Sequence, residues 1–313
     1  MNASSEPQPE KHRKKVGYLF GKKITHSLSP PFHQAVYDHF DLNWEQLRLD
    51  SADIDEFLRL TKQPNFYGAA VTMPNKVAIL PYLDGMTEEC RDVGACNTIF
   101  LKQKDGRRQL YGTNTDVIGI RDSFLRNVPH PASSIHGRPA LVVGGGGAAR
   151  SAIYALRKSM NVTHIYLVNR DAQEVEDMMK DCTLRGYGQD LVHIQTEEQA
   201  RLAETPGAIV ACVPDFEPQS HEEKMARSIL HILLSGPMLG VMLEMCYNPT
   251  PFTKLAALAE GLGWSIILGT EAMIWQGLEQ DKYWTGRKVE DMPIEKLQAL
   301  VDREIQRQRL DRL

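Results

Sequence analysis

Residues 139–158 read PALVVGGGGAARSAIYALRK, and this stretch decides the fold of the second half of the chain. An apolar run rich in β-branched residues predicts a strand, the glycines predict a tight turn, and the residues beyond them predict an amphipathic helix. Gly144, Gly146 and Ala149 match the pattern G-x-G-x-x-A, in which the glycines permit the turn and let the backbone approach a pyrophosphate. N–H groups at the start of such a helix bind phosphate oxygens. The predicted dinucleotide contacts are Gly144, Gly146, Gly147, Ala148 and Ala149.

Strands and helices alternate on both sides of this turn. Further strands are predicted beyond it in THIYLVNR, GAIVACVP, GVMLEMCY and WSIILG. This alternation indicates an α/β fold with a parallel, doubly wound sheet of Rossmann type. Before it, short apolar runs alternate with helical patterns, and NTIFLKQKDGRRQLYGTNTD predicts two strands joined by a turn at Asp105-Gly106.

These patterns divide the chain into four parts. Residues 1–16 are polar and predict a disordered tail. Residues 17–128 form a first α/β domain, and the proline-rich stretch NVPHPASSIHGRP marks its boundary with a Rossmann domain of residues 135–268. Residues 269–313 read as helices and end in an amphipathic, strongly charged segment.

Composition excludes several classes of protein. Of 313 residues, 42% are hydrophobic and 24% are charged, which is ordinary for a globular protein. The net charge of −4 leaves no basic stripe for nucleic acid, and no apolar run approaches the roughly 18 residues of a membrane span. The scattered cysteines form no C-x-x-C pair, and the histidines show no metal-ligand spacing. We therefore expect a cytoplasmic protein with no metal, nucleic-acid or membrane partner.

The residues after the second Rossmann strand bear on the choice of cofactor. An NAD site typically carries an acidic residue for the ribose 2′-hydroxyl about 20 residues after the glycines. The residues near this position are Asn169, Arg170 and Asp171. Arg170 suits a 2′-phosphate or an adenine ring, whereas Asp171 and Glu174 would repel a phosphate. Asp171 also suits the N-cap of the next helix, and the two roles are compatible. The local charge predicts NAD, with NADP as the alternative.

Four stretches of the first half place polar residues at the ends of predicted strands. They are ITHSLSP (24–30), VTMPNK (71–76), GACNTI (94–99) and GTNTD (112–116). Strand ends beside loops are where α/β folds bind ligands. The single residues leave simpler interpretations open: Asp116 suits a helix cap, and Ser-Leu-Ser-Pro suits a helix N-terminus. The candidates are Ser27, Ser29, Thr72, Lys76, Asn97, Thr115 and Asp116.

In this order, and followed by the glycine turn, these stretches resemble the shikimate/quinate dehydrogenase family. The similarity continues through EMCYNPTPFTKLA and GTEAMIWQG and spans roughly residues 17–285. It implies a first domain that binds a polyhydroxy cyclohexane carboxylate, a second that binds a nicotinamide cofactor, and C-terminal helices that pack on the first. It also implies a catalytic pair, Lys76 and Asp116. The other implied residues are Ser27, Ser29, Thr72, Asn97, Tyr247 and Gln276 for the substrate and Gly269 for the cofactor.

The implied chemistry gives Lys76 a role. Oxidising a ring hydroxyl requires its proton to leave as hydride is transferred, and the reverse reaction requires a proton donor at the carbonyl oxygen. Because lysine is protonated in neutral water, we expect Lys76 to be charged at rest, as an acid and as a stabiliser of the oxyanion. Asp116 is expected to orient both the lysine and the hydroxyl.

Three features depart from the family's pattern. Asp171 and Glu174 stand where NADP-using members carry Asn-Arg-Thr and a further basic residue, Glu244 replaces an aspartate, and ACVPDFEP lacks a Thr-Ser-x-Gly turn. The first departure favours NAD, which in this family goes with quinate oxidation. The retained serine pair suits shikimate, but VYDHFDLNWEQLRLD is similar to free-standing fungal-type quinate dehydrogenases.

We therefore expect an NAD-dependent oxidoreductase, monomeric or homodimeric, that acts on quinate and takes shikimate as a second substrate. One alternative is an NADP-dependent biosynthetic shikimate dehydrogenase, which would keep every catalytic residue. The other is a non-catalytic sensor of the same metabolites, against which the intact pair of Lys76 and Asp116 speaks.

Overall fold

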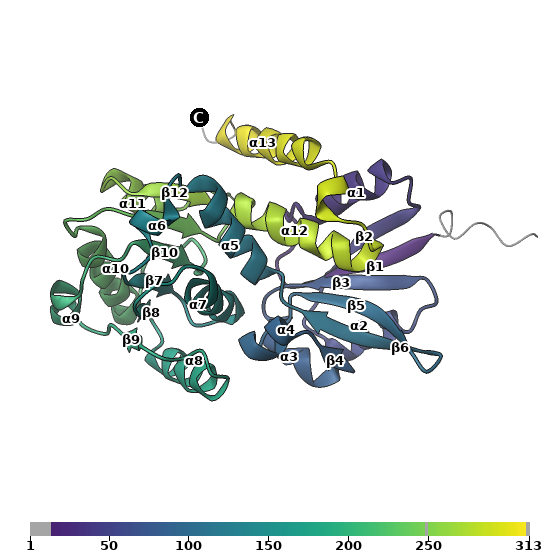
Figure 1. The fold of residues 1–313 in the computed structure, drawn as a ribbon, viewed down its shortest axis with the longest axis horizontal. Coiled ribbons are helices and arrows are strands. Elements are labelled where there is room, and N and C mark those ends of the chain that lie inside the picture. Colours follow the sequence, from purple (N-terminus) through teal and green to yellow (C-terminus); the bar gives the residue numbers. More distant parts are fainter. Residues whose placement is uncertain (1–13, 248–249, 311–313) are drawn as a thin grey trace, which may run out of the picture. The chain divides into compact units, whose positions relative to one another are not determined.

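The computed structural model describes residues 14–247 and 250–310, and these fall into two compact units. The first unit comprises residues 14–86, 96–112 and 277–307, and the second comprises 87–95, 113–276 without the undescribed 248–249, and 308–310. Each unit is built around its own sheet (Figure 1). Most of the predicted tail, residues 1–13, lies outside the described residues, and the first strand begins within its last part, at Lys15.

The sheet of the first unit has the strand order β2-β1-β3-β5-β6-β4. Strand β1 pairs parallel with β2 and β3, and β3 pairs antiparallel with β5. The strands are β1 (Lys15–Gly21), β2 (Trp44–Asp50), β3 (Phe66–Val71), β4 (Gly85–Met86), β5 (Thr98–Lys104) and β6 (Arg107–Thr113). The helices are α1 (Ser29–His39), α2 (Ile54–Thr61), α3 (Asn75–Ala78) and α13 (Ile294–Leu310), with 3₁₀ turns at Leu80–Tyr82 and Val289–Asp291.

The predicted turn between β5 and β6 is confirmed. Asp105 and Gly106 have φ angles of 52° and 71°, the left-handed pair that a two-residue hairpin turn requires. The predicted strand in GAAVT is also confirmed, since every residue of β3 is buried. A buried central strand leaves its polar continuation, from Thr72 onward, at the edge of the core.

The second unit contains the predicted Rossmann sheet. Its order is β12-β11-β10-β7-β8-β9, and every neighbouring pair is parallel, so in chain order it follows the doubly wound arrangement 3-2-1-4-5-6. The strands are β7 (Ala140–Val143), β8 (Ile165–Val168), β9 (Leu191–His193), β10 (Ala208–Ala211), β11 (Val241–Glu244) and β12 (Ser265–Leu268). The helices are α4 (Glu88–Val93), α5 (Asp116–Asn127), α6 (Pro131–Ser134), α7 (Gly147–Ser159), α8 (Ala172–Leu184), α9 (Glu197–Leu202), α10 (His221–Leu234) and α11 (Lys254–Gly261), and α12 (Gly269–Thr285) continues from this unit into the first.

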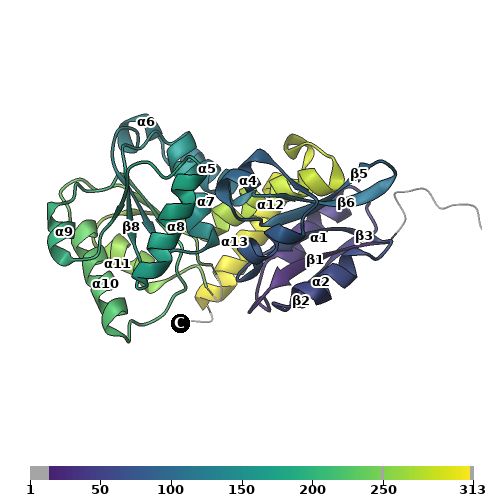
Figure 2. The same ribbon diagram turned by 90° about the horizontal axis from the view of Figure 1, so that it is seen from below.

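Helices cover both faces of this sheet. Along β7, Ala140 and Val142 belong to the core formed with α5, α7 and α8, whereas Leu141 and Val143 belong to the core formed with α9, α10 and α11. Figure 2 shows α7 and α8 on one side of β8 and α9 and α10 on the other. The alternation of side chains along buried parallel strands requires this two-sided cover.

Helix α5 belongs to the second unit, although the sequence pattern placed residues 113–128 in the first domain. Its apolar residues Val117, Ile120 and Phe124 are buried in the core that α7 shares. An amphipathic pattern predicts a buried face but not which core covers it. Within the described residues, no helix has the length and apolar character needed to cross a bilayer.

Candidate active site

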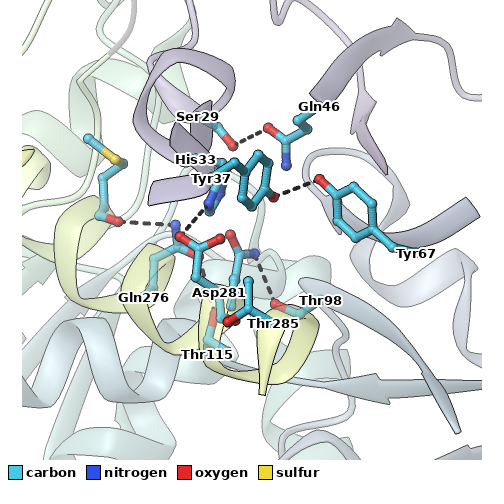
Figure 3. Close-up of polar contacts among 12 residues, drawn as sticks. Ser29, His33, Tyr37, Gln46, Tyr67, Thr98, Thr115, Gln276, Asp281 and Thr285 are labelled. Atoms are coloured by element: carbon cyan, nitrogen blue, oxygen red, sulfur yellow. Dashed lines mark hydrogen bonds and ion pairs between the residues drawn. The ribbon is translucent and has the colours of Figure 1, made fainter. Parts of the chain in front are cut away.

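The two predicted serines lie where the loop after β1 enters α1, and both are buried. The N–H of Ser29 donates to Ser27 Oγ at 3.3 Å, and its hydroxyl donates to Gln46 Oε1 of β2 at 2.8 Å (Figure 3). Arg48 Nη2 donates to the Ser27 carbonyl at 2.7 Å. Strand β2 therefore fixes the serine loop through Gln46 and Arg48, two positions that the sequence pattern did not indicate.

Lys76 lies in α3, close behind the buried strand β3. The Lys76 carbonyl accepts the N–H of Cys96 at 2.7 Å, and the Asn97 carbonyl accepts the N–H of Val71 at 2.7 Å. The backbone thus brings Lys76 and Asn97 together at the end of β3, beside the half-buried Thr72. Three residues from two separate sequence motifs therefore share one edge of the first sheet, as predicted for a ligand site.

The buried Asn97 side chain is oriented by its neighbours. Thr98 Oγ1 donates to Asn97 Oδ1 at 2.8 Å, and Gln280 Nε2 of α12 donates to Thr98 Oγ1 at 2.9 Å. Gln280 Nε2 also lies 3.3 Å from the Asn97 carbonyl oxygen. Because Oδ1 faces a donor, the network distinguishes the two ends of the Asn97 amide. Gln280 is a second positioning residue that the sequence pattern did not indicate.

A buried pair ties α1 to the C-terminal part of α12 within the first unit (Figure 3). His33 Nδ1 and Asp281 Oδ2 are 2.8 Å apart, and both side chains have 0% exposure. Burial raises the pKa of the Asp281 carboxyl, and His33 opposes this effect. The hydroxyls of Tyr37 and Tyr67 lie 2.6 Å apart in the same cluster. These contacts hold the part of α12 that carries Gln280.

In the second unit, Asp116 is buried and is the first residue of α5. The N-cap position belongs to Thr115, so Asp116 is not the N-cap that the simpler interpretation considered. Thr115 Oγ1 donates to Gln276 Oε1 of α12 at 3.2 Å (Figure 3). Gly119 permits this approach, because a Cβ there would lie 2.5 Å from the Ala272 carbonyl oxygen. Two predicted residues, Asp116 and Gln276, therefore lie on neighbouring helix segments of one unit.

The glycine turn lies where the strand order of the second sheet reverses, between β7 and β10, which is the ligand position of doubly wound sheets. Gly144 has a φ of +120°, and its N–H donates to the Val168 carbonyl at 2.9 Å. Glycine is required there, since L side chains rarely adopt that φ. Helix α7 begins at Gly147 without a side-chain cap, so the turn fits the pyrophosphate of a dinucleotide.

The three candidates after β8 have partners within the chain. Asn169 Nδ2 donates to Glu174 Oε2 at 2.6 Å. Asp171 is the N-cap of α8 and accepts the N–H of Glu174 at 3.1 Å, which confirms the capping interpretation. Arg170 pairs with Glu223 of α10. None of these side chains requires a ligand to explain its position.

Gly269 and Glu244 meet at the end of β11. A Cβ at Gly269 would lie 2.5 Å from the Glu244 carbonyl oxygen. The longer side chain of Glu244 is buried and accepts the hydroxyl of Thr253 at 2.7 Å and the N–H of Cys246 at 3.0 Å. Burial raises the pKa of Glu244 to about 7, although these two hydrogen bonds lower it. Tyr247 follows half-buried, and its neighbours 248–249 lie outside the described residues.

Replacing Glu244 by glutamine is expected to flatten the dependence of stability on pH. The folded-state pKa of about 7 exceeds the ordinary 4.5, so stability is complete below 4.5 and is lost as the pH rises through 7. The wild type should lose roughly 3 kcal/mol relative to Glu244→Gln between about pH 5 and about pH 8. Urea unfolding across this range measures the difference, with Glu260→Gln as an exposed control. Parallel curves for the wild type and Glu244→Gln would contradict the account.

Comparisons with known proteins agree with this geometry. Residues 19–99 match the family model described as the shikimate dehydrogenase substrate binding domain. The chain is 46% identical over 305 residues to a quinate dehydrogenase from Emericella nidulans, covering 91% of this chain and 93% of that protein.

Two solved structures share the fold. The dehydroquinate dehydratase and shikimate dehydrogenase from S. pombe AroM aligns with a TM-score of 0.71 and 30% identity, over 91% of this chain and 52% of that one. The quinate dehydrogenase from Corynebacterium glutamicum in complex with NAD aligns with a TM-score of 0.72 and 21% identity, over 91% and 98%.

The resemblance predicted from the ordered motifs is thereby confirmed. It rests on near-complete coverage of a relative at 46% identity, and the substrate-domain match covers the stretch that holds Ser27, Lys76 and Asn97. The chain belongs to the shikimate/quinate dehydrogenase family.

Proposed function

We propose that the protein is an NAD-dependent quinate dehydrogenase that also accepts shikimate. The observation that carries this proposal is the 46% identity, over 91% of the chain, to the quinate dehydrogenase of Emericella nidulans. The reaction transfers a hydride between the nicotinamide ring and the ring carbon that carries the reacting hydroxyl of quinate or shikimate, while the hydroxyl proton passes to a base, giving the 3-dehydro product. The five cysteines are odd in number and form no C-x-x-C pair, which suits a reducing compartment, and a cytoplasmic location is part of the same proposal.

The substrate side of the proposal uses the first unit. Ser27 and Ser29 would hold the carboxylate, because their loop is fixed by β2 and brings two hydroxyls to one place. Thr72 and Asn97 would bind ring hydroxyls. Many hydrogen bonds to a polyol give specificity, since a substrate that lacks a hydroxyl leaves buried polar groups unpaired. Tyr247 and Gln276 are proposed as further substrate-binding residues.

The cofactor side uses the glycine turn. Gly144, Gly146 and the first N–H groups of α7 would hold the pyrophosphate. Gly269, which starts α12 against the end of β11, is proposed to lie along the same cofactor. When bound, the nicotinamide ring supplies the hydride acceptor. The residues after β8 would face the adenosine ribose, as they do in doubly wound dinucleotide folds.

The proposal assigns proton transfer to Lys76 and orientation of the reacting hydroxyl to Asp116. Lys76 Nζ would donate a proton to the carbonyl oxygen in reduction and, in its neutral form, take the hydroxyl proton in oxidation. The carbonyl of Lys76 and the start of α3 are fixed by the Cys96 N–H and by the end of β3, so the lysine stands on a backbone held by hydrogen bonds. Asp116 stands on the first turn of α5, where the positive end of the helix favours a carboxylate.

A shikimate dehydrogenase is the second candidate. It is supported by the 30% identity to the shikimate dehydrogenase part of S. pombe AroM, whose structure this chain matches over 52% of its length. The same proposed residues would serve that activity. The two candidates differ in the preferred polyol and in the preferred cofactor.

Initial rates with quinate and shikimate, each with NAD+ and NADP+, test the proposal. We expect quinate with NAD+ to give the highest kcat/KM, shikimate with NAD+ to follow, and both NADP+ reactions to be at least about tenfold slower. A preference for shikimate with NADP+ would instead favour the second candidate. Binding of quinate without turnover of either cofactor would favour a sensor.

A further inference from the structure

Arg170 stands at the place that decides between the two cofactors. It is the second residue after β8, the strand next to the one that leads into the glycine turn. In doubly wound dinucleotide folds, the residues at this strand end face the 2′ position of the adenosine ribose, where an acidic side chain selects NAD and an arginine accommodates the phosphate of NADP. Taken alone, Arg170 would therefore predict NADP.

The guanidinium of Arg170 is already engaged. Its Nη1 pairs with Glu223 Oε1 of α10, and its guanidinium carbon lies 5.4 Å from the centre of the Phe216 ring. The Arg170 side chain is 57% exposed, whereas that of Glu223 is only 12% exposed. The pair is thus built on a carboxylate that the fold has buried, with the more exposed arginine as its partner.

Both oxygens of Glu223 have partners. While Oε1 pairs with Arg170, Oε2 accepts the N–H of Gln219 at 2.8 Å and the N–H of Ser220 at 3.1 Å. Ser220 Oγ accepts the N–H of Glu223 in return, which completes a capping box at the start of α10. These backbone N–H groups, together with Arg170, lower the pKa of Glu223, so its negative charge persists at neutral pH.

A second carboxylate faces the same region. Glu174 accepts Asn169 Nδ2 at 2.6 Å, and its carboxylate lies so close to the glycine turn that a Cβ at Gly145 would be 2.9 Å from Oε2. A negative charge against the turn disfavours an additional phosphate nearby. Arg170 is the only cation among the side chains just described.

We infer that Glu223 is a specificity-determining residue of the cofactor site, because it holds Arg170 and so withholds the guanidinium from the 2′-phosphate of NADP. This inference rests on the proposed function and deepens it. Binding of a 2′-phosphate would require Arg170 to leave both Glu223 and the ring of Phe216. NAD has no such phosphate and leaves the pair intact, so selectivity for NAD follows although an arginine is present.

The variant Glu223→Gln isolates the effect of the Glu223 charge on cofactor selectivity. Glutamine serves in a capping box as well as glutamate does, so its Oε1 can keep the N–H groups of Gln219 and Ser220 while the charge on Arg170's partner is lost. The matched control is Glu222→Gln. Glu222 is an exposed neighbour on the same helix turn, so this change removes an equal charge without touching Arg170.

Calorimetric titration with 5′-AMP and 2′,5′-ADP measures the selectivity without catalysis. For Glu223→Gln we expect the affinity for 2′,5′-ADP to rise about tenfold, as a released arginine gains a charge-assisted phosphate contact, while the affinity for 5′-AMP is unchanged. Glu222→Gln should behave as the wild type does. The double variant Glu223→Gln/Arg170→Ala should lose the gain, which would assign it to Arg170. The ratio of kcat/KM for NADP+ to that for NAD+ should follow the binding data.

The outcomes separate this inference from the proposed function. A wild-type protein that binds 5′-AMP and NAD+, with no gain in Glu223→Gln, overturns the role of Glu223 and leaves the dehydrogenase proposal standing. An equal gain in Glu222→Gln, or one that survives Arg170→Ala, also overturns it. A wild-type protein that binds neither nucleotide overturns the cofactor site and this inference with it.

Discussion

Replacing Lys76 with alanine is expected to lower kcat for quinate oxidation about 10³-fold, while KM changes by less than about threefold. The ε-amino group is proposed to take the proton of the reacting hydroxyl, so its loss removes an interaction that is strongest in the transition state. The serines and Asn97, which are proposed to bind the substrate, are untouched. Steady-state kinetics with saturating NAD+ measure both constants.

The matched control for this change is Lys62→Ala. Lys62 is an exposed lysine of the same unit, at the end of α2, and its removal should leave both constants at wild-type values. Retained turnover in Lys76→Ala would remove Lys76 from the proton-transfer role. A large rise in KM with kcat unchanged would make it a binding residue instead.

Replacing Asp281 with alanine is expected to lower the free energy of unfolding by about 3 kcal/mol. The change leaves the fully buried His33 without its partner, 2.8 Å away in the wild type, and a buried polar group without a partner keeps its full desolvation cost. Because Asp281 follows Gln280 on α12, we also expect KM for quinate to rise as the orientation of Asn97 is loosened. Urea unfolding and quinate kinetics measure the two effects.

The double variant His33→Leu/Asp281→Leu provides the control for this pair. When both members of the pair are replaced by apolar residues, neither of the two is left buried without the other, so the stability should exceed that of Asp281→Ala. If the double variant is less stable than the single one, the pair contributes through packing rather than through its polar contact. An Asp281→Ala protein as stable as the wild type would contradict the role given to the buried pair.

The parts of the fold set by local patterns could be predicted from the sequence. The turn after β7 requires a glycine at φ +120°, and the hairpin turn has Asp105-Gly106 in the left-handed conformation. One or two residues therefore identify each turn in the sequence. Strand β9 was not predicted, because it has only three residues and none of them is buried. Its pairing with β8 comes from the neighbouring strand rather than from its own apolar content.

Some residues of the candidate site could likewise be predicted from the sequence, and others could not. Four of the candidates could be predicted because each is a polar residue at the end of a strand or helix, next to apolar residues. They are Ser27, Lys76, Asn97 and Asp116. Gln46 and Gln280 do not interrupt a pattern, and only the hydrogen bonds to Ser29 and Thr98 identify them.

The pairing of Arg170 with Glu223 could be recognised only from the structure. Its partner Glu223 is 53 residues away along the chain, and no motif in the sequence indicated that glutamate. Charge counting near Arg170 predicted NAD from Asp171 and Glu174, and Asp171 also caps α8. The pairing of the guanidinium with a fixed carboxylate adds a second physical reason for the same proposed preference.

The most direct test of the central claim is the quinate and NAD+ reaction of the four-way comparison, followed to its product. The account predicts that the purified protein forms one NADH for each quinate consumed, and that mass spectrometry identifies a product lighter than quinate by two hydrogens. NADH formation should disappear with Lys76→Ala and persist with Lys62→Ala. Quinate that binds to the wild-type protein but returns unchanged, with no NADH or NADPH formed, would contradict the assignment of a dehydrogenase.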